Sequence, residues 1–342
     1  MRMNQPGGTG RAAVVAGLGS ALPSRVVSNE ELSRRLDTSD EWIRTRTGVE
    51  QRHIIDPGMA TSDLAVVAGS RALKSADTTD VGAVVLATTT PDRPCPATAP
   101  DVADRLGVSA VPAFDVSAVC SGFVYGLAVG AGMIATQVAN SVLVIGADTY
   151  STILNPEDRT TAAIFGDGAG AVVLRAGTPD EHGALGPFDL GSDGSLADLI
   201  TIPAGGSRQR SSGEPVEPGD RYFQMQGRRV FRNAVFRMVN SARAVLDRAG
   251  WQVSDVHRLV AHQANSRILT AVAKELALPM DRVVSNIARV GNTSAASIPL
   301  ALGDAVLEGV LRPGQRVLLT AFGGGLTWGS TVLTWPGVPA IA

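Results

Sequence analysis

Cysteine is scarce in this sequence, whose 342 residues include only Cys95 and Cys120. A disulfide scaffold requires several cysteines, so the scarcity argues against one and predicts a reducing, cytoplasmic location. Net charge is small as well, at a formal −2. This balance argues against a general nucleic-acid or membrane-surface protein, and the length suffices for two domains or one large composite core.

The sequence also lacks an apolar signal-peptide core at its start, and it lacks charged residues over one long stretch. Residues 1–10 are polar and glycine-rich, lack the apolar core of a signal peptide, and predict a disordered tail. Residues 116–147 contain no charge and are long enough to span a membrane. They also contain several polar side chains, and Val142–Ile145 is β-branched and strand-like. We therefore expect a buried helix over 120–139, followed by a buried strand.

The apolar strand candidates recur in matching order, which indicates an internal duplication. Leu86 and Leu143 lie 57 residues apart, and Val260 and Leu318 lie 58 apart. Cys120 and Asn292 would then occupy equivalent places, each at the start of an apolar helix. Each half would contribute one central sheet, with the two apolar helices stacked between the sheets. The loop-like stretch 205–220 is interpreted as a surface excursion.

Cys120 is the candidate nucleophile. A cysteine in the first turn of a helix meets free backbone N–H groups and the positive end of the helix dipole, which favour the thiolate. His262 follows an apolar strand-like run, and Asn292 follows Gly291 at another strand-to-helix junction. Alone, these residues would be a buried thiol, a core histidine and a helix cap. Together they indicate a Cys-His-Asn site.

The chain resembles β-ketoacyl-acyl-carrier-protein synthase III, a thiolase-fold condensing enzyme, from about residue 11 to residue 335. The motifs that carry this resemblance occur in the family's order: Thr38-Ser-Asp-Glu-Trp-Ile43, Thr45-Arg-Thr-Gly-Val49, Asp115-Val-Ser-Ala-Val-Cys-Ser-Gly-Phe123, Phe165-Gly-Asp-Gly-Ala-Gly-Ala171, His262-Gln-Ala-Asn-Ser-Arg-Ile268, Gly291-Asn-Thr-Ser-Ala-Ala-Ser297 and Ala321-Phe-Gly-Gly-Gly-Leu-Thr-Trp328. The resemblance implies an α/β fold layered α-β-α-β-α, with two mixed sheets and buried helices between them. Residues 11–178 would form the half with the nucleophile, and residues 179–342 the half with His262 and Asn292.

The resemblance implies a decarboxylative condensation. Cys120 would take an acyl group from acyl-CoA. His262 and Asn292 would stabilise the enolate formed when malonyl-acyl-carrier protein loses carbon dioxide. The backbone N–H groups of Cys120 and Gly324 would form the oxyanion hole. The product would be a β-ketoacyl-carrier protein that starts fatty-acid or polyketide synthesis, without a metal or other cofactor.

The resemblance also assigns binding residues and a homodimer. The expected CoA contacts are Trp42, Arg46, Thr47, Arg159, Arg228 and Asn265, with Trp42 and Arg159 enclosing the adenine. Arg228 stands where the family carries asparagine. The expected acyl-carrier-protein patch is Arg232, Arg267 and Lys274, which Glu275 dilutes. Cys95 falls where acetyl-specific relatives often carry phenylalanine, so a larger acyl pocket is predicted, gated by Cys95 across the dimer.

Three alternatives remain open at this point. A related acyltransferase or a polyketide-priming enzyme with an unusual starter would keep the fold and change the substrates. A cysteine hydrolase would use the same three residue types, although the Cys-Gly-Ser-Cys-Trp signature is absent. A non-enzymatic interaction protein would leave Cys120 unreactive.

Overall fold

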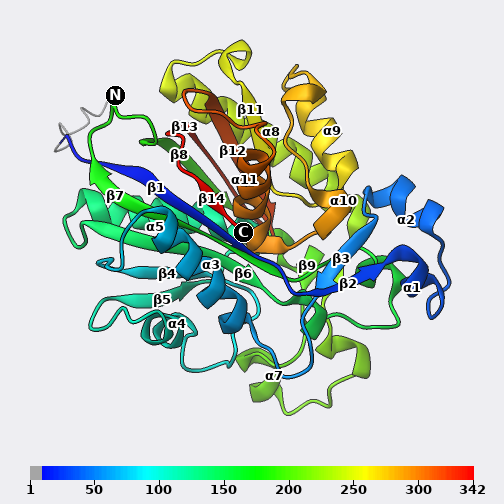
Figure 1. Ribbon diagram of the computed structural model, residues 1–342. Coiled ribbons are helices and arrows are strands. Elements are labelled where there is room, and N and C mark those ends of the chain that lie inside the picture. Colours follow the sequence, from blue (N-terminus) through cyan, green and yellow to red (C-terminus); the bar gives the residue numbers. More distant parts are fainter. Residues whose placement is uncertain (1–9) are drawn as a thin grey trace.

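Two β-sheets form the framework of the protein (Figure 1). The structure is a computed structural model that describes residues 10–342, so the predicted tail, apart from exposed Gly10, lies outside the described residues. In spatial order the first sheet contains β14 (Ala340–Ile341), β1 (Ala12–Ala21), β7 (Gly168–Gly177), β6 (Ser141–Asp148), β4 (Val84–Ala87) and β5 (Ala113–Val116). The second contains β11 (Arg258–Ala261), β12 (Arg316–Gly323), β13 (Thr327–Thr334) and β8 (Leu185–Ser192).

Helices form three layers around the two sheets. The outer face of the first sheet is covered by α3 (Thr61–Ser75) and α4 (Ala99–Arg105), and that of the second by α8 (Gly227–Ala249) and α9 (Ser266–Glu275). The central layer contains α5 (Gly122–Ala135) and α11 (Ser297–Leu307), which share one apolar core with both sheets. This arrangement confirms the predicted α-β-α-β-α fold.

The side-chain alternation of the strands explains the layering. In β6, Val142 and Val144 face the central core, whereas Leu143 and Ile145 face the outer helices. Successive strand residues point to opposite faces, so an uninterrupted apolar run is what a strand between two helical layers requires. Most of the charge-free stretch 116–147 is therefore buried in this fold, apart mainly from the exposed turn around residues 135–140. None of the helices described over residues 10–342 has both the length and the apolar character to cross a bilayer.

The strand pairings of the two sheets repeat. In each sheet a parallel pair (β4 with β6, β11 with β12) continues into two antiparallel neighbours. The segment before Asn292 forms no full strand, contrary to our expectation. It makes only a single parallel bridge, between Leu259 and Val283, in the place that β5 takes beside β4. The division of the chain after residue 178 stays a prediction.

The register of the repeat corrects one predicted equivalence. The helix α5 begins at Gly122 and α11 at Ser297, and each follows a short 3₁₀ turn, Val119–Ser121 and Ser294–Ala296. The residue equivalent to Cys120 is therefore Ala295, and Asn292 lies three residues earlier. The predicted helix 120–139 is also shorter than expected, because Cys120 belongs to the 3₁₀ turn and the helix ends at Ala135.

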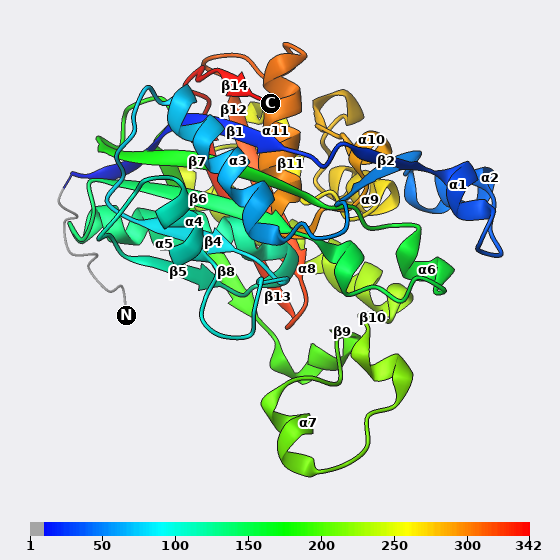
Figure 2. The same ribbon diagram turned by 60° about the horizontal axis from the view of Figure 1, so that its bottom comes forward.

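The remaining elements lie at one end of the sheets. A small sheet of β2 (Arg25–Ser28) and β3 (Gln51–Ile54) lies beside α1 (Asn29–Ser33) and α2 (Asp40–Thr47). The short helices α6 (Arg159–Ala162) and α10 (Ile287–Val290) complete this end. The predicted surface excursion 205–220 contains the exposed helix α7 (Ser207–Ser212) and projects from the body, anchored by β9 (Ile200–Thr201) and β10 (Gln224–Met225) (Figure 2).

Candidate active site

Cys120 lies in a tight turn between β5 and α5. The preceding Val119 has φ of 48°, a left-handed conformation that is unfavourable for a β-branched residue. The turn packs against the glycines that follow β12: a Cβ atom at Gly323 would lie 2.8 Å from the Cys120 nitrogen. Only glycine permits this approach. Thr327 joins the two turns by donating its hydroxyl to the Ala118 carbonyl at 3.0 Å.

The environment of Cys120 favours the thiol over the thiolate. The side chain is buried, and burial raises its pKa to about 12. The hydroxyl of Ser294 donates to the Cys120 sulfur at 3.6 Å and opposes this shift, whereas the buried carboxylate of Asp148 adds to it. The backbone at the start of the helix does favour the thiolate, as expected, but desolvation is the larger effect, so the thiol is the favoured form.

His262 follows β11, and its ring is fixed by the central helix α11. Ser297 Oγ, at the start of α11, lies 2.7 Å from His262 Nδ1. The imidazole is buried, and desolvation lowers its pKa to about 3. His262 is consequently neutral at physiological pH, with Nε2 as its second ring nitrogen for a substrate.

Asn292 is held by its own backbone and by the turn before α11. Its N–H donates to the Ile164 carbonyl at 2.9 Å, and its carbonyl accepts from the Gly166 N–H at 3.0 Å. The side-chain Oδ1 accepts from the Ser294 N–H at 2.9 Å, while Nδ2 makes only a long contact, 3.5 Å, with the Ala264 carbonyl. This orientation leaves the amide N–H₂ as the group available to a substrate.

The turn before α11 therefore brings the three predicted residues together. Ser294 contacts both Cys120 and Asn292, and Ser297 contacts His262. Neutral hydrogen-bond donors beside a buried thiol can stabilise a developing oxyanion. Gly324, the predicted oxyanion donor, belongs to the same glycine turn, and a Cβ atom there would meet Val119 Cγ2 at 3.3 Å. The catalytic roles of these residues stay predictions.

Three residues around this centre were not predicted from the sequence. Ser294 and Ser297 lie two and five residues after Asn292, within one of the family motifs, but neither was assigned a role. Asp148, which is fully buried, accepts from the N–H groups of Thr89 and Ala295 at 2.7 and 3.0 Å. Burial raises the pKa of Asp148 to about 6. Asp148 could have been noticed in the sequence because it is the first charged residue after the uncharged stretch and lies at the carboxyl end of a strand.

Trp42, Arg46 and Arg159 meet on the surface at α2. The guanidinium carbons of Arg46 and Arg159 lie 4.8 and 5.3 Å from the Trp42 ring centroid. Arg159 also pairs with Asp37 at 2.9 Å. The Arg159–Trp42 distance is that of a direct cation–π contact. An adenine ring between them would need about 7 Å, two layers of van der Waals contact, so Arg159 would have to move.

The side chains of the other predicted CoA contacts differ in whether they are free to contact a ligand. Thr47 is buried, and its hydroxyl donates to the Ile43 carbonyl at 2.6 Å, so the structure gives no support to a ligand contact there. Asn265 Nδ2 donates to the Arg46 carbonyl at 3.0 Å, while Oδ1 accepts from the Arg267 N–H, so Asn265 joins α2 to α9. Arg228 is exposed at the first turn of α8.

The predicted carrier-protein patch spans α8 and α9. Arg232, Arg267 and Lys274 are all exposed. Arg267 lies over Phe231 of α8, with 5.9 Å between its guanidinium carbon and the ring centroid, so the two helices present their charges side by side. Cys95 is exposed in the loop between β4 and α4. Within residues 10–342, no group of three or more His, Cys, Asp or Glu side chains is placed to hold a metal ion.

Family models and curated relatives match most of the chain. Residues 114–194 match the model of 3-oxoacyl-[acyl-carrier-protein] synthase III, and residues 246–335 match the model of its C-terminal part. The chain is 65% identical to β-ketoacyl-[acyl-carrier-protein] synthase III 3 of Streptomyces coelicolor, covering 97% of this chain and 99% of that relative. It is 58% identical to the Pseudomonas aeruginosa synthase III over 95% and 97% of the two chains.

Solved structures show the same likeness. The crystal structure of synthase III from Pseudomonas aeruginosa PAO1 has a TM-score of 0.90 and 56% identity, covering 96% of this chain and 99% of that one. The priming β-ketosynthase of the R1128 polyketide pathway has a TM-score of 0.89 and 34% identity, covering 98% and 99%. These matches confirm the predicted fold and transferase class, and they set aside the cysteine hydrolase and the non-enzymatic alternative. The chain belongs to the β-ketoacyl-acyl-carrier-protein synthase III family.

Proposed function

We propose that this enzyme condenses an acyl-CoA primer with malonyl-acyl-carrier protein and releases carbon dioxide. The observation that carries the proposal is the convergence of Cys120, His262 and Asn292 on the turn before α11. In the first step the sulfur of Cys120 bonds to the acyl carbonyl carbon and the bond to the CoA sulfur breaks. The proton lost by Cys120 leaves with the CoA thiol.

In the second step the malonyl carboxylate leaves as carbon dioxide, and its electron pair forms an enolate. His262 and Asn292 donate hydrogen bonds to the thioester oxygen that carries this charge. A neutral His262 suits this role when Ser297 donates to Nδ1, because Nε2 then holds the proton. The enolate carbon attacks acyl-Cys120, the carbon–sulfur bond breaks, and the released thiolate takes up a proton from solvent.

A Cys120→Ala variant tests these roles. It should form no acyl-enzyme, measured by intact-protein mass spectrometry, because no sulfur remains to accept the acyl group. It should still decarboxylate malonyl-carrier protein, since His262 and Asn292 are retained. Asn292→Ala should show the opposite pattern, acylation with a condensation rate lower by about 10²–10³. Full acyl transfer by Cys120→Ala would refute the assignment of the nucleophile.

The binding residues and the assembly complete the proposal. Trp42, Arg46 and Arg159 would bind the CoA nucleotide, and Arg232, Arg267 and Lys274 the carrier protein. The reaction would need no cofactor beyond its substrates, and the scarcity of cysteine favours a cytoplasmic location. Among residues 10–342 the edge strand β5 pairs only with β4 and is half-buried, which supports a homodimer formed at this edge.

A priming role in polyketide synthesis is the second candidate. It is favoured by the likeness to the R1128 priming β-ketosynthase, whose fold matches this one nearly as well as that of the Pseudomonas aeruginosa synthase. A mass-spectrometric survey of the acyl-CoAs that load onto Cys120 distinguishes the two. Exclusive loading of short fatty-acid primers would count against the polyketide role.

A further inference from the structure

Arg52, in β3, is a fully buried arginine. Among the described residues it forms no ion pair with a carboxylate. Its guanidinium donates to the Val27 carbonyl at 3.1 Å, to the Ala163 carbonyl at 2.8 Å and to Asn29 Oδ1 at 2.8 Å. Burial lowers its pKa to about 10, so it remains charged at neutral pH. A buried charge is costly unless it is hydrogen-bonded, and these three acceptors come from two distant parts of the chain, residues 27–29 and Ala163.

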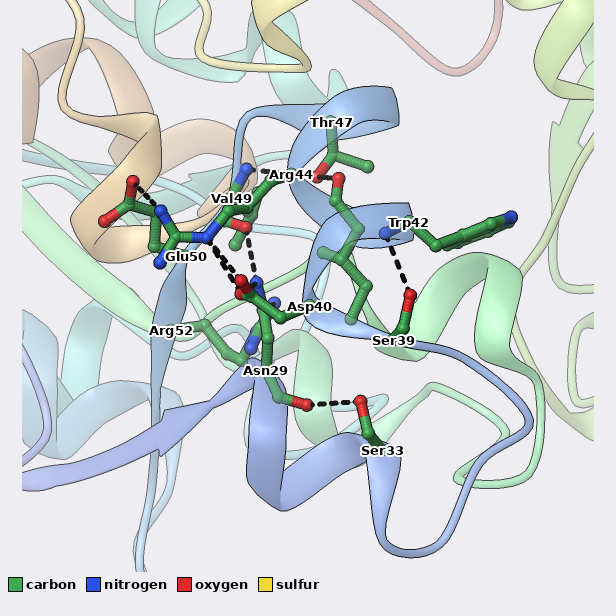
Figure 3. Close-up of polar contacts among 11 residues, drawn as sticks. Asn29, Ser33, Ser39, Asp40, Trp42, Arg44, Thr47, Val49, Glu50 and Arg52 are labelled. Carbon is green, nitrogen blue, oxygen red and sulfur yellow. Dashed lines mark hydrogen bonds and ion pairs between the residues drawn. The ribbon is translucent and has the colours of Figure 1, made fainter.

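The contact with Asn29 leads to α2. The Asn29 amide nitrogen donates to Asp40 Oδ1 and to the Val49 carbonyl, both at 2.8 Å (Figure 3). Asp40 is the first residue of α2, and Val49 lies just beyond its last. One buried amide therefore holds both ends of this helix, while Arg52 fixes the orientation of the amide. Trp42 points from α2 away from this network (Figure 3).

The contact with Ala163 leads to the candidate active site. Ala163 is followed by Ile164 and Gly166, whose backbone groups bond the N–H and the carbonyl of Asn292. The stem of Arg52 lies against the same segments. A Cβ atom at Gly166 would be 3.1 Å from Arg52 Cβ, and one at Gly291 would be 3.3 Å away. Arg52 thus lies close to Gly291, which precedes Asn292, and to Gly166, whose N–H donates to the Asn292 carbonyl.

We propose that Arg52 is a positioning residue that joins α2 to the backbone holding Asn292, through Asn29 on one side and Ala163 on the other. The inference rests on the proposed role of α2 in binding the CoA nucleotide. In this arrangement the helix that binds the nucleotide keeps a fixed position relative to the site where the thioester reacts. Binding of the nucleotide then places the acyl carbonyl at Cys120.

Paired substrates test the link to α2. An acyl-CoA and the matching acyl-pantetheine share the thioester, and only the first carries the nucleotide. Asn29→Ala removes the amide that holds α2 but leaves the contacts of Arg52 with Val27 and Ala163. It should raise the KM for acyl-CoA by between about 2-fold and about 30-fold, the span of a modest network coupling. The KM for acyl-pantetheine and the rate of malonyl-carrier decarboxylation should not change.

Arg25→Gln is the matched control. It removes an exposed ion pair with Glu31 on the neighbouring strand and helix, and it should leave both KM values unchanged. Arg52→Lys keeps a charge but lacks the forked guanidinium that bonds both residues 27–29 and Ala163, so it should also slow decarboxylation. If thermal unfolding shows that Arg52→Lys does not fold, Asn29→Ala decides alone. An equal change for both substrates in Asn29→Ala would indicate a general structural role and overturn the proposal.

A Trp42→Ala variant distinguishes two claims: that the nucleotide binds at α2, and that Arg52 positions α2. If it raises the KM for acyl-CoA selectively and Asn29→Ala does not, α2 binds the nucleotide but Arg52 does not position it, and the present inference fails. If Trp42→Ala leaves the ratio of the two KM values unchanged, the nucleotide does not bind at α2, and both proposals fail. Selective effects of both variants support both.

Discussion

At the candidate active site, the three side chains chosen for catalysis are all held uncharged. Burial raises the pKa of Cys120 to about 12 and lowers that of His262 to about 3. Asn292 carries no charge at any pH. Three uncharged side chains exert little pull on a bound thioester in its ground state. They can still donate hydrogen bonds where negative charge develops, which is the differential stabilisation that catalysis needs.

The reactivity of Cys120 should therefore depend on pH over a wide range. In a Cys95→Ser background, which leaves Cys120 as the only thiol, alkylation by iodoacetamide should accelerate continuously above pH 7. The thiolate is the reacting species, and its fraction grows by about tenfold per pH unit below the pKa. Peptide mapping of the labelled site gives the rate. A plateau below pH 9 would show that the turn stabilises the thiolate after all.

The buried His262 should make the protein less stable in mild acid. Its pKa is lower in the folded state, so its favourable contribution is present above pH 6.5 and is lost as the pH falls toward 3. Between pH 7.5 and 5 the unfolded chain binds this proton and the native protein does not. The free energy of unfolding should fall by about 2 kcal/mol from this group.

Urea unfolding of the wild type and of His262→Gln measures that contribution as a difference. The comparison is needed because Asp148 acts in the opposite direction. Burial raises its pKa to about 6, so the native state takes up a proton on Asp148 as the pH falls and is stabilised relative to the unfolded chain. Equal pH dependence in the two proteins would mean that His262 is already charged in the native state.

At the scale of elements, the catalytic and the binding surfaces are built differently. The catalytic groups stand on turns that pack against one another between the sheets, where a change in one contact reaches its neighbours. The proposed carrier-protein patch instead lies on the exposed sides of α8 and α9, where single charges are screened by water and salt. Substitutions in the patch should therefore affect binding and leave the chemistry intact.

Charge reversal on the patch tests this difference. Arg232→Glu and Arg267→Glu should each raise the KM for malonyl-carrier protein by roughly five-fold, since an exposed ion pair contributes up to about 1 kcal/mol. The kcat and the rate of self-acylation by acyl-CoA should stay unchanged. Lys74→Glu, the same charge change on the exposed side of α3, is the control. An effect that persists undiminished in high salt would argue against electrostatic docking.

At the scale of the whole molecule, duplication gives the two halves different tasks. Both halves place a residue with positive φ at the first position of the 3₁₀ turn before the central helix, Val119 at 48° and Ser294 at 50°. In the first half the next residue is Cys120, the predicted nucleophile. In the second it is Ala295, whose N–H donates to Asp148. Because that N–H already has a partner, we expect only the first of the two turns to bind a substrate.

The predicted homodimer and the acyl pocket belong to this scale too. If Cys95 closes the pocket of the partner subunit, Cys95→Phe should lose acyl-CoAs larger than acetyl and retain acetyl-CoA. Each buried methylene contributes about 0.8 kcal/mol of binding, or roughly fourfold in affinity. Competition between acyl-CoAs, followed by mass spectrometry of acyl-Cys120, measures the profile, and sedimentation measures the dimer. An unchanged profile would show that another residue closes the pocket.

The layers of the fold and the three central residues were predicted from the sequence. Strand periods are local properties, so the β-branched run Val142–Ile145 predicted a buried strand, which is part of β6. Cys120 and His262 were recognisable because each follows a strand-like run, and Asn292 because it follows a glycine before an apolar helix. The ordered motifs then identified the family.

Only the tertiary structure decided what surrounds those residues. The pKa of Cys120 depends on desolvation by segments distant in the chain, which local helix-terminus reasoning cannot weigh. The exact partner of Cys120 in the repeat, Ala295, emerged only from the aligned helix starts. The links from Arg52 to Asn29 and Ala163 span 23 and 111 residues. Hydrogen bonds over such separations form only when the sheets and helices have packed, and no local pattern encodes them.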